Sequence, residues 1–148
     1  MAVAAHVSRV SKEYAPHGFS VVQDMTASMA VPTGTTDDFY LPLVNASDGD
    51  IYLEAVHYAA ITGLESHGTN YWTMGFVYGA SGLASETAIH SGHVGGASTV
   101  VGINTLTAVT ITTPVVPQGN TLFLKCDANH ASSPAETVGA TVRYRRKA

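Results

Sequence analysis

Apolar and polar residues alternate along most of the chain, and the alternation is clearest near the C-terminal end. In residues 138–145, and again in residues 121–128, every second residue is apolar or aromatic. These apolar sets are Val138, Ala140, Val142 and Tyr144 in one segment and Leu122, Leu124 and Cys126 in the other. A period of two is typical of a β-strand with one buried face. No helical pattern competes with it, so we expect an all-β protein.

The same alternation, interrupted by turn-forming residues, predicts about eight strands. They lie at residues 21–31, 39–44, 51–60, 71–78, 98–101, 106–113, 121–128 and 138–145. Short strands at this spacing, without crossover helices, favour a two-sheet β-sandwich or jelly roll. We expect antiparallel sheets, because parallel sheets are buried on both faces and have continuous apolar strands.

Some segments allow more specific expectations. Trp72, Met74, Phe76 and Tyr78 share one face of their strand, and they should form the centre of the core. Pro42 lacks a backbone N–H, so its strand should lie at an edge or contain a bulge. The turn-forming residues at 45–50 and 114–120 predict connections.

Residues 79–97 contain five glycines and show no clear period. We interpret them as a long loop, or as a loop with a short strand or helical turn around residues 85–90. A second loop is expected at residues 129–136. These two loops are the recognition elements that a rigid sandwich would present.

A chain of 148 residues is most simply one domain with a core of its own. The pattern is weak over residues 1–20, which end in a turn at Pro16 and Gly18. We therefore predict an extended N-terminal arm at residues 1–20 and a single sandwich domain at residues 21–148. Termini are usually disordered unless other residues hold them, and we expect this arm to be held in place, for example by a neighbouring chain.

Charged residues make up only 12% of the chain, and hydrophobic residues make up 45%. Because the chain has few charges, electrostatic repulsion does little to oppose its association with other proteins. We therefore expect partners to cover much of the surface. Four of the seven basic residues lie within residues 143–148, namely Arg143, Arg145, Arg146 and Lys147. Without them the chain has three basic and eleven acidic residues, a net charge of −8.

The basic end has two interpretations. It docks on an acidic partner, or it is a solvated strand end that keeps the terminus soluble. Four charges are few for nucleic acid, so we do not expect a nucleic-acid partner. No apolar run approaches the length needed to cross a bilayer. The first twenty residues lack a signal-peptide pattern, and we expect synthesis in a cytoplasm.

No pattern of catalytic or metal-binding residues is convincing. His90 and His93 lie three apart in the glycine-rich loop, but zinc requires three or four ligands and only Glu86 is near in sequence. Glu54 and His57 should lie on opposite faces of a regular strand. Cys126, the single cysteine, is expected to be buried and cannot form an intrachain disulfide. We predict no enzyme activity, metal or cofactor.

Several segments resemble small structural proteins of tailed bacteriophages, and in particular the jelly-roll head-decoration or cement proteins. The similarity is carried by residues 68–77, 107–111, 117–124 and 139–144. These segments include three motifs that recur in that group: an Asn-Tyr-aromatic strand, a Pro-x-Gly-Asn turn and a final Val-rich strand. It covers roughly residues 50–148. The Gly- and His-rich loop and the basic C-terminus depart from that pattern.

The resemblance implies a homotrimer on the outside of a capsid, bound to the major capsid protein, which clamps adjacent capsomers. The location would be the virion surface, after synthesis in the host cytoplasm. We predict that the contacts to capsid or neighbouring subunits are made by Arg9, Tyr14, His90, His93, Arg143, Arg145, Arg146 and Lys147. The alternative is a receptor- or carbohydrate-binding module of a tail fibre or spike, with Trp72 and the tyrosines as a sugar platform.

Overall fold

The fold was analysed in a computed structural model of the chain. It describes residues 21–33, 37–62, 69–81, 83–91, 94–95, 102–103, 105–128 and 135–147. The predicted arm at residues 1–20, the predicted strand at 98–101 and most of the predicted loop at 129–136 lie outside these residues.

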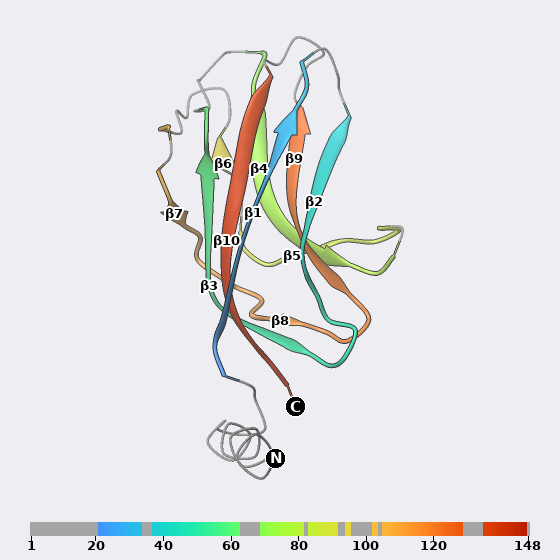
Figure 1. The fold of residues 1–148 in the computed structure, drawn as a ribbon. Helices are drawn as coiled ribbons and strands as arrows, with labels where there is room; N and C mark the ends of the chain where they lie inside the picture. Colours follow the sequence, from blue (N-terminus) through green and yellow to red (C-terminus); the bar gives the residue numbers. More distant parts are fainter. Residues whose placement is uncertain are drawn as a thin grey trace, which may run out of the picture.

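The described part of the chain contains ten strands and no helix, as the alternation predicts (Figure 1). Six of the strands are long: β1 (Gln23–Val31), β2 (Asp38–Asn45), β3 (Ile51–Ala60), β4 (Trp72–Gly79), β9 (Thr121–Ala128) and β10 (Glu136–Arg146). Four have two residues each: β5 (Thr87–Ala88), β6 (Val94–Gly95), β7 (Thr107–Ala108) and β8 (Val115–Val116).

The strands form two antiparallel sheets that pack face to face (Figure 1). The first sheet has the order β1-β10-β3, and both β7 and β8 pair with the remaining side of β3. The second has the order β2-β9-β4, and both β5 and β6 pair with β4. Strands β1 to β4 fall alternately in the two sheets, and the last two strands of the chain are central. This is the arrangement of a jelly roll.

The core lies between the two sheets and is built from alternate residues of the long strands. Trp72, Met74 and Phe76 are at most 2% exposed, and Tyr78 packs against the core from its margin. The predicted aromatic face is therefore the centre of the core. The inward residues of β9 and β10 (Leu122, Leu124 and Cys126; Val138, Ala140 and Val142) are likewise at most 2% exposed.

Both expectations for Pro42 are confirmed, because β2 is the edge strand of its sheet and its register with β9 shifts between Pro42 and Val44. A second register shift lies between β3 and β10. There Arg143 faces Ala55, while the next residue, Tyr144, faces Leu53, so Glu54 is the extra residue of a bulge.

The bulge changes which residues of β3 share a face. Leu53 and Val56 both belong to the core, although they lie three apart. Glu54 and His57 therefore both lie outside the core, and the expectation that they occupy opposite faces is wrong. A bulge cannot be read from the alternation of β3 alone, because it depends on the pairing with β10.

Residues 106–113 do not form the single strand that was predicted. Only β7 pairs with β3 there, and the Val109 amide donates to the Val56 carbonyl at 3.0 Å. The chain then crosses toward the other sheet, where the amides of Thr112 and Thr113 both donate to the Ile89 carbonyl. It returns to β3 as β8, inside the stretch predicted as a connection. The short strand expected around residues 85–90 is present as β5.

Two turns meet at one end of the sandwich. Gly49 (φ 145°) and Gly119 (φ 86°) both have the positive φ that favours glycine. The Asp50 side chain accepts a hydrogen bond from the Gln118 amide at 2.9 Å, and the Asp50 carbonyl accepts one from the Lys147 amide at 2.9 Å. Asp48-Gly49-Asp50 is therefore part of a turn that holds the C-terminal strand.

Substitution of Leu124 by Ala tests the core. The Leu124 side chain is fully buried in the central strand β9, so its loss leaves a cavity. We expect the free energy of unfolding to fall by about 2–5 kcal/mol, measured by urea denaturation. Leu106→Ala is the matched control, because Leu106 is 58% exposed and should change the value by less than about 0.5 kcal/mol. Equal losses in both variants would contradict the observed packing.

Candidate functional site

The basic residues near the C-terminus belong to the last strand and not to a free tail. Arg143 and Arg145 lie on the outer side of β10, and Arg146 is its last residue. Lys147 follows, with its backbone tied to Asp50 and its side chain exposed. Of the other predicted contact residues, Arg9, Tyr14 and His93 lie outside the described residues.

Arg143 forms a two-pronged ion pair with Asp24 across the β1–β10 pairing. Its Nε donates to Asp24 Oδ1 at 2.8 Å, and its Nη2 donates to Oδ2 at 3.1 Å. The hydrogen bonds from Arg143 lower the pKa of Asp24 below its usual value. Both side chains are more than half exposed, so solvent weakens the pair and it contributes little to stability.

Arg145 and Arg146 are also engaged within the chain. Arg145 forms an ion pair with Glu54, the extra residue of the β3 bulge. Arg146 donates from Nη1 to the Asn45 carbonyl at 2.8 Å, and its guanidinium lies 5.5 Å from the centre of the Tyr144 ring. Three of the four basic residues thus hold neighbouring strands, which reduces the positive charge that this end presents.

His90 is buried, with 7% of its surface exposed. Its Nε2 accepts a hydrogen bond from the Phe76 amide at 3.0 Å, and its ring meets the Phe76 ring edge-on. The Ile89 amide donates to the Phe76 carbonyl at 3.0 Å, so the His90 side chain continues the pairing of β5 with β4. This structural role accounts for the burial. The contact of His90 with a partner stays a prediction, and little of the residue is exposed for such a contact.

A cluster of five side chains lies on the outer face of the second sheet, and we call it the Lys125 cluster. The Lys125 amino group lies 2.7 Å from Glu86 Oε1, 3.3 Å from Asp38 Oδ2 and 3.4 Å from Asp127 Oδ1. The Tyr40 hydroxyl donates to Glu86 Oε2 at 2.9 Å, and its ring lies beneath the Lys125 amino group. Three carboxylates thus surround one cation and leave an excess of negative charge.

Burial and hydrogen bonds shift the pKa values within the cluster. Burial, together with a hydrogen bond to Asp38, raises the pKa of Asp127. Burial alone would lower the pKa of Lys125, but its hydrogen bonds to Glu86 and Tyr40 outweigh burial and raise it. Burial and the bond to Glu86 raise the pKa of Tyr40. Lys125 stays charged, and Asp127 is the carboxylate whose ionisation is disfavoured.

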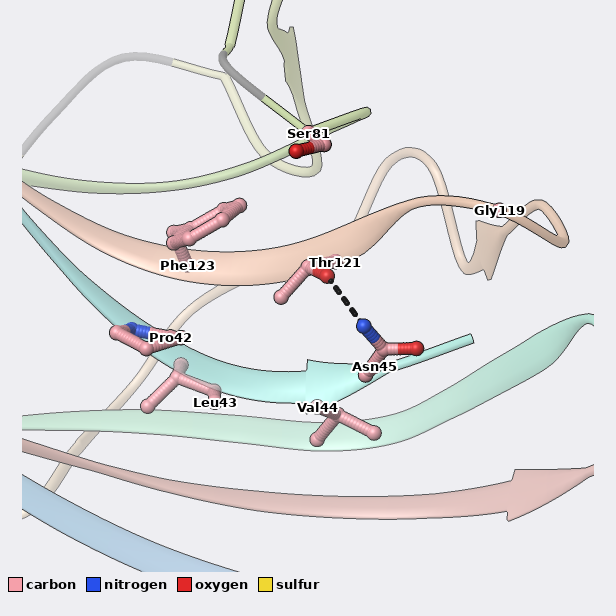
Figure 2. Close-up of a pocket in the computed structure, with 8 residues that line it drawn as sticks. All are labelled: Pro42, Leu43, Val44, Asn45, Ser81, Gly119, Thr121 and Phe123. Atoms are coloured by element: carbon pink, nitrogen blue, oxygen red, sulfur yellow. Dashed lines mark hydrogen bonds between the residues drawn. The ribbon is translucent and has the colours of Figure 1, made fainter. Parts of the chain in front are cut away.

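A hollow of about 400 Å³ lies where β2 ends and β9 begins, next to the turn at Ser81 (Figure 2). Asn45 and Thr121 line its floor and are joined by a hydrogen bond of 3.0 Å from Nδ2 to Oγ1. Phe123 also lines the hollow (Figure 2). Its ring meets the ring of Tyr40 edge-on, with 6.1 Å between the centroids. An aromatic ring beside neutral polar groups is suited to binding a ligand.

The described residues offer little for catalysis. Cys126 is fully buried, and burial raises the pKa of its thiol to about 12, so it is not a reactive thiolate. Within the described ranges no three His, Cys, Asp or Glu residues are grouped so that they could hold a metal ion. The same part of the chain contains no helix long and apolar enough to span a membrane.

The Lys125 cluster and the Phe123 hollow were missed from the sequence. Lys125 and Asp127 alternate with the apolar residues of their strand, but that signal is common to many exposed residues. The cluster forms only because Asp38 pairs with Asp127, and because Glu86 is brought next to them from the turn before β5. Strand order and register, which alternation does not encode, were the missing information.

The chain matches no protein-family model and no curated protein sequence. Its fold is similar to that of a chain in the structure of the cyanophage Pam1 capsid asymmetric unit. That likeness has a TM-score of 0.52 and 20% sequence identity, and covers 88% of this chain and 87% of that chain. At this identity it establishes a shared fold.

A second solved structure, of Bacillus endospore appendages that form disulfide-linked pili, gives a TM-score of 0.39. It is 14% identical over 85% of this chain and 88% of that chain. This likeness is too low to add to the comparison of folds.

The raised pKa of Asp127 predicts a particular pH dependence. The folded state binds this proton more tightly than the unfolded state does, so protonation of Asp127 stabilises the fold as the pH falls from 7 toward 4. The substitution Asp127→Asn removes the titrating carboxyl group and with it this stabilisation at low pH. The difference between the melting temperature of the wild type and that of Asp127→Asn, both measured by circular dichroism, should therefore increase in favour of the wild type as the pH falls.

Asp24→Asn is the matched control, because the pKa of Asp24 is shifted in the opposite direction. Its ion pair with Arg143 persists above the usual carboxyl value of 3.8 and is lost as the pH falls further. The difference between the wild type and Asp24→Asn should stay constant from pH 7 to pH 4. The same pH trend for both variants would contradict the assignment.

Proposed function

We propose that this chain is a structural virion protein that binds the outside of a phage capsid as a trimer and reinforces the contacts between capsomers. The observation that carries the proposal is the fold shared with a chain of the cyanophage Pam1 capsid asymmetric unit. The likeness covers 88% of this chain and 87% of that chain, so it extends over most of the two-sheet fold. It supports a capsid-associated role.

The physical character of the molecule fits a protein that acts by being bound. The two sheets enclose an apolar core, and only 12% of the residues in the chain are charged. A partner that binds only the assembled shell stabilises that shell by its free energy of binding. Reinforcement of this kind requires a rigid body with surfaces for its neighbours and no reacting groups.

The basic end of β10 is the region that we assign to the capsid. Arg146 and Lys147 lie together at the end of the sandwich where the turns at Gly49 and Gly119 also meet. An acidic patch on the major capsid protein would complement them. Arg143 and Arg145 hold strands through their ion pairs and would contribute at the margin of this contact.

Purified expanded capsids provide the test. We expect the protein to have the mass of a trimer in solution, to bind these capsids, and to raise their melting temperature in calorimetry. Lys147→Gln should weaken binding and reduce its dependence on ionic strength, since Lys147 is exposed and its removal leaves the pairing of β10 intact. Absence of capsid binding by the wild type would refute the proposal.

The alternative is a carbohydrate-binding module of a tail fibre or spike, and the hollow beside Phe123 is the observation that favours it. Trp72 is only 2% exposed and cannot serve as a sugar platform, whereas Phe123 lines the hollow with Asn45 and Thr121 (Figure 2). A glycan array distinguishes the two functions. The capsid proposal expects no saturable binding; binding that Phe123→Ala abolishes would favour the module.

A further inference from the structure

The edges of the two sheets are not equally protected. An exposed edge presents unpaired N–H and C=O groups to any extended chain, and proteins usually shorten, bend or block it. Among the described residues, the edge strand β2 contains Pro42 and a register shift. The opposite edges are formed by β5 and β6 in one sheet and by β7 and β8 in the other, each with two residues.

Strand β1 is different from these edges. It pairs with β10 over nine residues, from Gln23 opposite Tyr144 to Val31 opposite Glu136, without a register shift. It contains neither proline nor lysine, and Asp24, its one charged residue, is held by Arg143. Every second residue of β1 directs its N–H and C=O away from β10. Within the described chain, β1 is paired on that one side only.

The core is also incomplete along β1. Val138, Ala140 and Val142 of β10 are at most 2% exposed. Their direct partners on β1 are Met29, Ala27 and Met25, which are only partly buried at the margin of the core. A further strand with apolar residues on the same face would cover these three side chains.

The chain itself contains a segment with that pattern. In an extended conformation, Val3, Ala5 and Val7 share one face, and Ala4, His6 and Ser8 share the other. We infer that this segment of a neighbouring copy adds to β1 as an antiparallel strand. Val3 would lie opposite Met29, Ala5 opposite Ala27 and Val7 opposite Met25.

On the outer face the same register places only small or polar residues opposite each other. Ala4 would face Ser28, His6 would face Thr26 and Ser8 would face Asp24. No like charges meet on this face. The pairing is thus compatible with the side chains on both faces of the sheet.

Chain length favours a neighbour over the same chain. Pairing of residues 3–8 with their own β1 would need a hairpin loop of fourteen residues, 9–22, whereas hairpin loops usually have two to five. The same fourteen residues can span roughly 45 Å when extended, which is ample to reach an adjacent subunit. Contact between two different surfaces gives a closed ring, such as a trimer, when its rotation closes. The inference rests on the proposed trimer and names the strand exchange that would hold it together.

Disulfide cross-linking of the full chain tests the pairing. The variant with Ala5→Cys and Ala27→Cys should give covalent dimers and trimers under oxidising conditions, seen on non-reducing gels. A mixture of the two single variants should cross-link only between unlike chains. Cys126 will not compete, because it is fully buried. The control pairs Ala5→Cys with Ala88→Cys, an exposed alanine of β5 on the other sheet, and should stay uncross-linked.

Hydrogen exchange provides a second measurement that needs no disulfide. In the wild-type trimer the outward amides of Gln23–Val31 should exchange slowly, and Ala5→Pro, which removes an N–H from the added strand, should accelerate them several-fold. Ala15→Pro lies in the connection and should leave them unchanged. Cross-links within single chains, no cross-links, or unprotected β1 amides in the wild type would each overturn the inference.

The outcome is separable from the proposed function. A protein that binds and stabilises capsids but fails to cross-link through Ala5 and Ala27 would refute the strand exchange and leave the capsid role in place. A protein that cross-links as expected but does not bind capsids would refute the capsid role and leave the strand exchange in place.

Discussion

The structure depends on one constraint: each sheet has a single apolar face, and the two faces must cover each other. Strands β9 and β10 satisfy this constraint most fully. Each is central in its sheet, and each contributes three fully or almost fully buried residues to the core. The other strands are ordered around them. Burial of these side chains is the main favourable term in folding, and each contributes on the order of 1–3 kcal/mol. The outer faces and the edges are then free to serve partners.

The sequence was most informative where one face of a long strand is buried and the other is not. Residues 121–128 coincide with β9, and residues 138–145 fall within β10, because burial of one face selects apolar residues at every second position. Trp72, Met74 and Phe76 were placed in the core for the same reason. The prediction was weakest at residues 106–113, where hydrogen bonds to Ile89 on the other sheet take the chain away from β3. Such long-range pairing leaves no local pattern.

The candidate site was less predictable than the fold. The four basic residues at the C-terminal end were visible at once, but their ion pairs depend on β1 and β3, which are distant in sequence. The glycine-rich loop suggested two available histidines, yet His90 is buried and continues the pairing of β4. The Lys125 cluster arises from strand register and from the turn before β5. Among the described residues, Lys125, Arg143 and Arg145 are thus each paired with carboxylates, whereas the edge strand β1 is paired on one side only.

Electron cryomicroscopy of expanded capsids incubated with the protein tests the central claim most directly, namely that this is a rigid sandwich whose role is to be held between neighbours. The account predicts trimeric density on the outer surface of the shell, into which the two-sheet domain fits with the basic end of β10 toward the capsid. Bare capsids, together with a protein that remains monomeric in solution, would contradict it.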